Sequence, residues 1–178
     1  MDINKADYNT IIKFGNLELF KEKLSLENTN LIDILNIVDK NGISMLQHSL
    51  VSRKFEISNY FIQNKANINI ISNEGCNELH YLASNINFEG ATQIANQLID
   101  MNVSLDLKEK KANNSPLWCL CHEVLKKRSQ DGILLIIKCL KNNPDIKSLN
   151  SAGYSVQKLI NERGTDEMKK VMEEIIHE

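Results

Sequence analysis

The stretches DKNGISMLQHSL (residues 39–50) and SNEGCNELHYLA (residues 72–83) align with each other without a gap. Gly42 falls on Gly75, so the offset between the two copies is 33 residues. Recurrence at a fixed period of about 20–50 residues is typical of proteins built from stacked repeats. The sequence therefore predicts a repeat architecture.

The segment that follows each glycine predicts a pair of short helices. Its apolar residues recur at helical rather than alternating spacing in the first copy: Leu46, Leu50, Val51, Ile57, Tyr60, Phe61 and Ile62. Residues 64–70 and 101–107 then combine Asn and small residues with alternating apolar positions, a pattern that favours a turn and a short extended finger. One unit is thus expected to read helix, turn, helix, finger.

Charge and composition exclude several classes of partner. The 178 residues carry a net charge of −2 and have a pI near 6.1, which argues against a nucleic-acid-binding surface. The basic clusters at 108–111 and 126–128 lack interleaved aromatic residues, so solvated faces are the simpler interpretation. The remaining candidate partner is another protein.

The chain also lacks the features of a secreted or membrane protein. Its N-terminus MDINKADYNT is polar and acidic, and its longest aliphatic run spans only residues 133–137. The four cysteines have neither the density nor the spacing of a disulfide framework. We expect a cytoplasmic protein with no membrane contact, and the bias toward Asn, Ile and Lys suggests an AT-rich, bacterial genome.

Residues 39–71 resemble an ankyrin repeat. The family pattern D-x-x-G-x-T-P-L-H-x-A is matched by Asp39, Gly42, Ser44, Leu46 and Ser49. The paired leucines of the second helix correspond to Phe61 and Ile62, and the motif G-A-D-V-N corresponds to residues 66–69. The resemblance implies an all-α ankyrin-type solenoid of stacked helix-turn-helix units with short β-hairpin-like fingers.

Degenerate copies of this unit cover nearly the whole chain, as one domain over residues 1–178. The approximate units are 3–38, 39–71, 72–108, 109–148 and 149–178. In the first, residues 11–24 resemble the junction between the two helices of a repeat. In the last, Met168, Val171, Met172, Ile175 and Ile176 form one apolar stripe on an otherwise charged helix, which predicts a C-terminal cap.

Catalytic chemistry is nearly absent from the sequence. The glycines never cluster, so phosphate-binding and dinucleotide-binding loops are not predicted, and no cofactor is expected. His80 invites assignment as a general base, but the resemblance implies a structural histidine whose ring bonds to backbone. We expect no enzyme activity.

A metal-dependent regulator is the alternative hypothesis. Cys119, Cys121 and His122 offer ligand types that zinc prefers. On a helix, however, the two cysteines point about 200° apart, and no second Cys or His pair lies at zinc-ribbon spacing. Small residues in a helix contact are the simpler interpretation, and Trp118 is likewise expected to fill the core.

The resemblance implies a non-catalytic, monomeric protein that binds a partner protein through its finger tips and inner helices. The roles considered are an adaptor and an inhibitor or immunity protein, with a secreted bacterial effector acting on a host protein as the alternative. Carried over residue by residue, the binding surface comprises Lys40, Asn41, Ile43, Ser52, Asn73, Glu74, Cys76, Asn85, Lys111, Asn114, His122, Glu123, Ser151 and Tyr154.

The fourth unit is 40 residues long, seven more than the period of 33. Insertions in repeat proteins map to loops, and long loops cost little stability. We therefore expect a loop around residues 124–132 whose basic residues serve recognition, and a melting temperature that barely changes when residues 126–130 are deleted.

Overall fold

The computed structural model describes residues 1–177, which form eleven helices and no strand. The prediction of an all-α fold is confirmed. The helices are α1 (Tyr8–Phe14), α2 (Leu17–Leu26), α3 (Leu31–Ile34), α4 (Met45–Val51), α5 (Phe55–Gln63), α6 (Glu78–Ala83), α7 (Ala91–Asp100), α8 (Pro116–Lys127), α9 (Gln130–Leu140), α10 (Val156–Arg163) and α11 (Asp166–His177). Among these residues, none of the helices combines the length and apolar character needed to cross a membrane.

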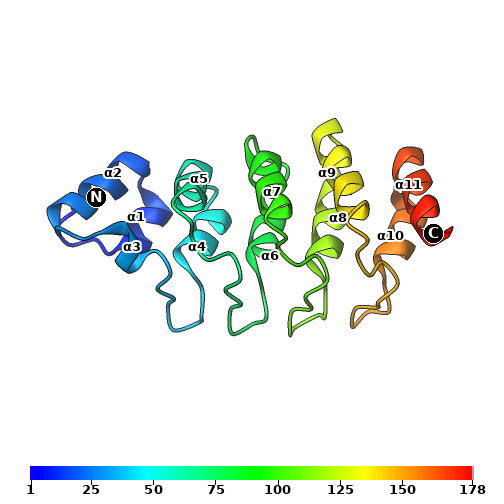
Figure 1. Ribbon diagram of the computed structural model, residues 1–178, viewed down its shortest axis with the longest axis horizontal. Helices are drawn as coiled ribbons and strands as arrows, with labels where there is room; N and C mark the ends of the chain where they lie inside the picture. The colour runs from blue at the N-terminus through cyan, green and yellow to red at the C-terminus, as the bar shows by residue number, and fades with distance from the viewer. Residues whose placement is uncertain (178) are drawn as a thin grey trace.

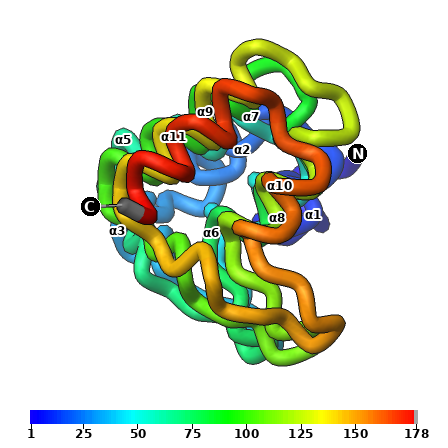
Figure 2. The backbone as a smooth tube through the Cα atoms, turned by 90° about the vertical axis from the view of Figure 1, so that its right-hand side faces the viewer, coloured from blue at the N-terminus to red at the C-terminus, as the bar shows by residue number. Residues whose placement is uncertain are grey.

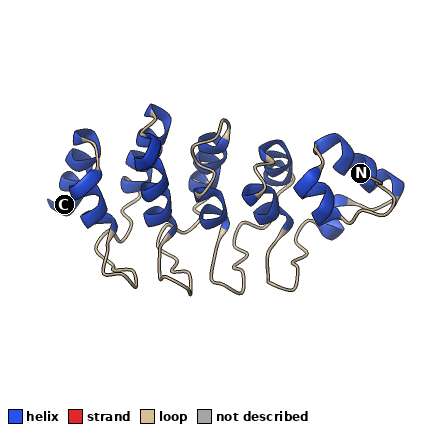
Figure 3. Ribbon diagram, turned by 180° about the vertical axis from the view of Figure 1, so that it is seen from behind, coloured by secondary structure: helices blue, strands red, loops and turns tan. Residues whose placement is uncertain are grey.

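The helices stand in pairs, and the pairs follow one another in a row (Figure 1). One row consists of α1, α4, α6, α8 and α10, which contact one another in that order. We call these the inner helices. The outer helices α5, α7, α9 and α11 form a second row alongside them, above the inner row in Figure 1, and the view along the stack shows the pairs nearly superposed (Figure 2). The loops that join one pair to the next all project to the same side (Figure 3).

The core lies between successive pairs. Each helix buries one apolar face, and the buried side chains form a single cluster from Ile11 near the N-terminus to Met172 near the C-terminus. At the N-terminal end the rings of Phe20 and Phe61 meet edge to face with centroids 5.1 Å apart, joining α2 to α5. Because one pair alone cannot cover its own apolar face, the pairs depend on stacking for stability.

The inner helices begin where the sequence supplies an N-cap. Ser44, Asn77, Ser115 and Ser155 precede α4, α6, α8 and α10, and each side chain accepts a hydrogen bond from the backbone N–H three residues on. A cap of this kind contributes about 1 kcal/mol to helix stability. The recurrence of these caps fixes the start of each inner helix in the row.

The projecting loops directly follow segments such as 64–70 and 101–107, which the sequence predicted to lead into fingers. We call these loops the fingers and define them as residues 38–44, 71–77, 108–115 and 149–155. Each turns through its own backbone hydrogen bond, for example from Asp39 N to Ile43 O at 3.0 Å and from Asn150 N to Tyr154 O at 2.8 Å. An isolated β-bridge joins Val38 and Ser44, but the described residues contain no regular strand. The expected hairpins are therefore tight loops, since too few residues pair to form a ladder.

Gly42 and Gly153 occupy equivalent turns and have φ angles of +73° and +75°. Alanine at either site is strained by about 1–2 kcal/mol. A Cβ on Gly42 would also lie 3.0 Å from Asn73 N in the next finger, whereas a Cβ on Gly153 would meet nothing within 4 Å. We expect Gly42→Ala to lower the melting temperature by roughly 2–4 °C more than Gly153→Ala, in proportion to about 1 kcal/mol of added strain. Equal losses by calorimetry would show that the finger contact adjusts freely.

The prediction of a loop at residues 124–132 is wrong. Helix α8 continues through Lys127 and α9 begins at Gln130, so Arg128 and Ser129 alone connect them. The additional residues lengthen the two helices, and Val124 and Leu125 are buried in the added turn of α8. The insertion is a prolonged helix pair because its apolar residues continue the helical period and find a neighbouring surface to cover.

The helices predicted at the two ends of the row are present, but the N-terminal end contains one further helix that was not predicted. The helices expected around residues 11–24 are present as α1 and α2, and the C-terminal stripe is confirmed because Met168 and Met172 are buried while its other residues pack against the core. The short helix α3 was not predicted, since four residues carry no readable periodicity. Glu178, the last residue of the predicted cap, lies outside the described residues.

Candidate functional site

Backbone hydrogen bonds tie each finger to the next. Asn73 N donates to Asn41 O, Lys110 N donates to Glu74 O, and Ser151 N donates to Ala112 O, each at 2.9 Å. These bonds recur at equivalent positions, so they hold the finger tips side by side in a fixed order. Side chains at the tips are thereby presented as one continuous surface.

The structure places the residues predicted for this surface in three environments. Those at the finger tips are exposed: Lys40, Asn41, Asn73, Glu74, Lys111 and Ser151. Others are half-buried along the inner helices and finger bases: Ile43, Ser52, Cys76, Asn114, His122, Glu123 and Tyr154. Asn85 is buried.

The assignment of Asn85 to the binding surface is therefore wrong. Its side-chain amide donates to Leu50 O at 3.0 Å and to Val51 O at 2.9 Å. These carbonyls belong to the last turn of α4, where no intrahelical donor is available. Asn85 thus caps the preceding inner helix and is not available to a partner.

Other residues of the same face were missed. His48, Tyr81 and Cys119 follow the N-caps of α4, α6 and α8 by four residues and are half-buried beside the fingers. His48 Nε2 lies 3.0 Å from Asp39 Oδ2, which links the helix to its finger. The sequence signal that could have identified these residues is their constant spacing of four residues after each N-cap.

The fingers also carry exposed aliphatic side chains that the sequence analysis did not single out. Val38, Ile71 and Leu149 have exposed fractions of 44%, 54% and 56%. Val38 and Ile71 directly precede Asp39 and Ser72, which begin the turns. Such residues add apolar contact area to an otherwise polar edge.

His80 has the structural role that the sequence predicted. Its Nδ1 accepts a hydrogen bond from Asn77 N at 3.2 Å, and its Nε2 donates to Asn114 O of the next finger, also at 3.2 Å. Burial lowers the pKa of His80 and so favours the neutral ring, while the two hydrogen bonds determine the tautomer. The imidazole joins two units and has no free nitrogen for proton transfer.

The cysteines lie in an environment that suppresses thiolate formation. Burial raises the pKa of Cys119 to about 12 and also raises that of the fully buried Cys121. Both thiols are therefore held in their protonated form in the metal-free protein. Among the described residues, no group of three or more His, Cys, Asp and Glu side chains could hold a metal ion.

A groove of about 420 Å³ separates the third and fourth fingers. It is lined by Lys111, Ala112, Asn114, Trp118, Asn150, Ser151, Ala152 and Tyr154. Asn150 Nδ2 donates to Asn114 Oδ1 at 2.8 Å and so joins the two walls. Four of the predicted surface residues meet here, which makes this groove the most complete part of the predicted site.

Trp118 lies in this groove only partly buried, so the prediction that it fills the core holds in part. Its ring stacks on His122 with centroids 5.0 Å apart and an interplanar angle of 19°. Trp118 Nε1 and His122 Nδ1 are shielded from solvent and have no hydrogen-bond partner among the described residues. Buried polar atoms without partners are rare in folded proteins and call for an explanation.

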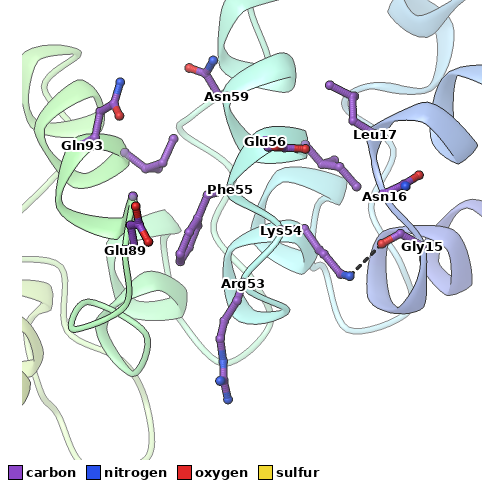
Figure 4. A pocket seen from close by; sticks show the side chains of 13 residues that line it. Gly15, Asn16, Leu17, Arg53, Lys54, Phe55, Glu56, Asn59, Glu89 and Gln93 are labelled. Atoms are coloured by element: carbon purple, nitrogen blue, oxygen red, sulfur yellow. Dashed lines mark hydrogen bonds between the residues drawn. The ribbon is translucent and has the colours of Figure 1, made fainter.

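A larger cavity of about 530 Å³ lies at the opposite end of the helix pairs, where α2, α5 and α7 begin (Figure 4). Lys54 points across it and donates to Gly15 O at 2.7 Å. Arg53 instead packs 4.1 Å over the ring of Phe88, and the cavity is also lined by Glu56 and Glu89. Its charges are mixed and its cations are engaged, so it offers neither a nucleophile with a base nor a clear charge preference.

No protein-family model matches this chain, and no curated protein matches it.

Proposed function

We propose that this chain is a degenerate ankyrin-repeat protein that acts as a non-catalytic module and binds another protein through its fingers and inner helices. The family assignment is supported by units that each combine a capped inner helix, an outer helix and a finger with a turn glycine or its equivalent. It is also supported by His80, whose ring bonds to backbone groups as the family pattern implies.

The observation that carries the functional proposal is the row of finger tips joined by the three equivalent backbone bonds of 2.9 Å. This row presents exposed side chains of different types in a rigid order, from Lys40 and Asn73 to Lys111 and Ser151. Rigid presentation lowers the entropy lost on binding, which favours specific protein recognition. Within this proposal, an adaptor and an inhibitor or immunity protein use the surface in the same way.

Site-specific photo-crosslinking tests the proposal. A photoreactive residue replaces Ser151 on the fourth finger or, as the matched control, the exposed Gln63 at the end of outer helix α5. In native cells we expect a discrete protein adduct at position 151 and none at position 63. Coexpressed protein without the photoreactive residue should compete the adduct away. Adducts of equal yield at both positions, or none at either, would refute recognition by the fingers.

A further inference from the structure

We propose that the groove between the third and fourth fingers binds an acidic segment of the partner protein, with its carboxylates held by Lys111 and Lys158. This inference rests on the proposed function and specifies the chemistry of the partner. The groove region combines two lysines, aromatic side chains and an indole N–H without a partner. The lysines favour acidic side chains, and the other two features favour a bound peptide.

The cations at the groove are not neutralised within the protein. Neither Lys111 nor Lys158 forms a salt bridge with the side chains that the structure describes. The acid nearest in sequence to Lys111 is Glu109, whose carboxylate accepts three backbone N–H groups of its own finger at 2.7–3.0 Å. On α8, Glu123 pairs with Lys126 at 2.6 Å. These two acids are therefore engaged elsewhere, and neither Lys111 nor Lys158 is paired with a carboxylate within the described residues.

Tyr154 positions one of these two cations, and Trp118 offers apolar contact. Lys158 Nζ lies 4.0 Å from the centroid of Tyr154, which lines the groove. This cation–π contact holds the ammonium group beside Tyr154, although Lys158 does not itself line the groove. Trp118 supplies a flat apolar surface on which the methylene groups of a glutamate side chain can pack.

The indole N–H of Trp118, a residue that lines the groove, has no hydrogen-bond acceptor within the described residues. Trp118 Nε1 can only donate, and an unsatisfied buried donor costs about 1–3 kcal/mol. A carbonyl or carboxylate oxygen of a bound segment has the chemistry to accept this bond. Backbone carbonyls in any peptide meet this need, while the lysines select for acidic side chains.

Trp118 is the only tryptophan in the chain, so intrinsic fluorescence reports directly on the groove. The probe is a hexaglutamate peptide, titrated at low salt against the wild type, Lys111→Gln and Lys158→Gln. We expect saturable quenching or a spectral shift, and roughly fivefold weaker binding for each lysine variant, equivalent to about 1 kcal/mol. The hexaglutamine peptide should bind roughly tenfold more weakly, and added salt should weaken hexaglutamate binding.

The matched control is Lys170→Gln on outer helix α11, which removes one exposed lysine away from the groove and should leave the affinity unchanged. Melting curves verify that every variant is folded. Equal affinity for the two peptides, equal effects of Lys111→Gln and Lys170→Gln, or tighter binding of a single-stranded oligonucleotide would overturn the inference. If hexaglutamate does not bind but position 151 still crosslinks to a protein, only this inference fails and the proposed function stands.

Discussion

Replacing Glu78 with glutamine is expected to stabilise the protein by several kcal/mol at pH 8 and to flatten the dependence of its melting temperature on pH. Glu78 is fully buried at the start of α6. Its Oε1 accepts a hydrogen bond from Gln47 Nε2 at 3.1 Å, and its Oε2 has no partner among the described residues. Burial raises the pKa of this carboxyl from 4.5 to about 8.

The raised pKa determines the direction of the effect. The folded protein retains a proton on Glu78 that the unfolded chain releases above pH 4.5. The stability is therefore fully present below pH 4.5 and is lost as the pH rises through about 8, at about 1.4 kcal/mol per pH unit. Glutamine occupies nearly the same volume, can accept the same bond from Gln47 and does not ionise.

Thermal melts of the wild type and Glu78→Gln between pH 5 and 8.5 measure this difference. The control is Glu74→Gln, which removes an exposed carboxylate from the neighbouring finger and should leave the pH dependence of the wild type intact. In Glu78→Gln the dependence of stability on pH should be weaker and of opposite sign, because His80 still titrates. Burial lowers its pKa below 6.5, so its contribution is lost as the pH falls. Parallel curves for wild type and Glu78→Gln would disprove the linkage.

Deleting residues 126–130 is expected to cost about 3 kcal/mol and to lower the melting temperature by roughly 6–12 °C. The deletion removes the last turn of α8, the left-handed C-cap at Arg128, whose φ is 56°, and the N-cap Ser129 of α9. It also disrupts the close packing of Val124 against Gly132, where an added Cβ would lie only 3.0 Å from Val124 Cγ1. The cost follows from lost caps and lost packing.

The control for this deletion keeps the chain length. The double substitution Lys126→Gln and Lys127→Gln removes two exposed cations but leaves the helix and its cap in place, so we expect a change below about 1 kcal/mol. Chemical denaturation of both variants gives the comparison. A deletion variant that melts within the error of the wild type would mean that the two helices rejoin without loss.

Much of the fold could be predicted from the sequence because its signals are local. The apolar period predicted the helix pairs, and cap residues such as Ser44 and Ser115 mark the observed helix starts. The prolonged α8 was missed because comparison with shorter units suggested a loop, although Val124 and Leu125 continue its apolar face. Length relative to neighbouring repeats was a weaker guide than the period itself.

The candidate site could be predicted only in part, for a different reason. Repeat register placed Lys111, Asn114, Ser151 and Tyr154 near one another, and the structure brings them into one groove. Register could not reveal that Asn85 turns inward to cap α4, because a side-chain rotation leaves no trace in spacing. Nor could it reveal the burial of Glu78, since acids in the first turn of a helix usually face solvent.

The single-file order of helix pairs determines how the molecule responds to mechanical force. Because helices contact those of adjacent pairs, a pull on the two ends is transmitted through every interface in series. Each interface then bears the same tension, and the weakest one separates first while the others stay closed. Extension should therefore proceed in discrete steps of about one helix pair, with rapid refolding between them because the contacts that re-form are local in sequence.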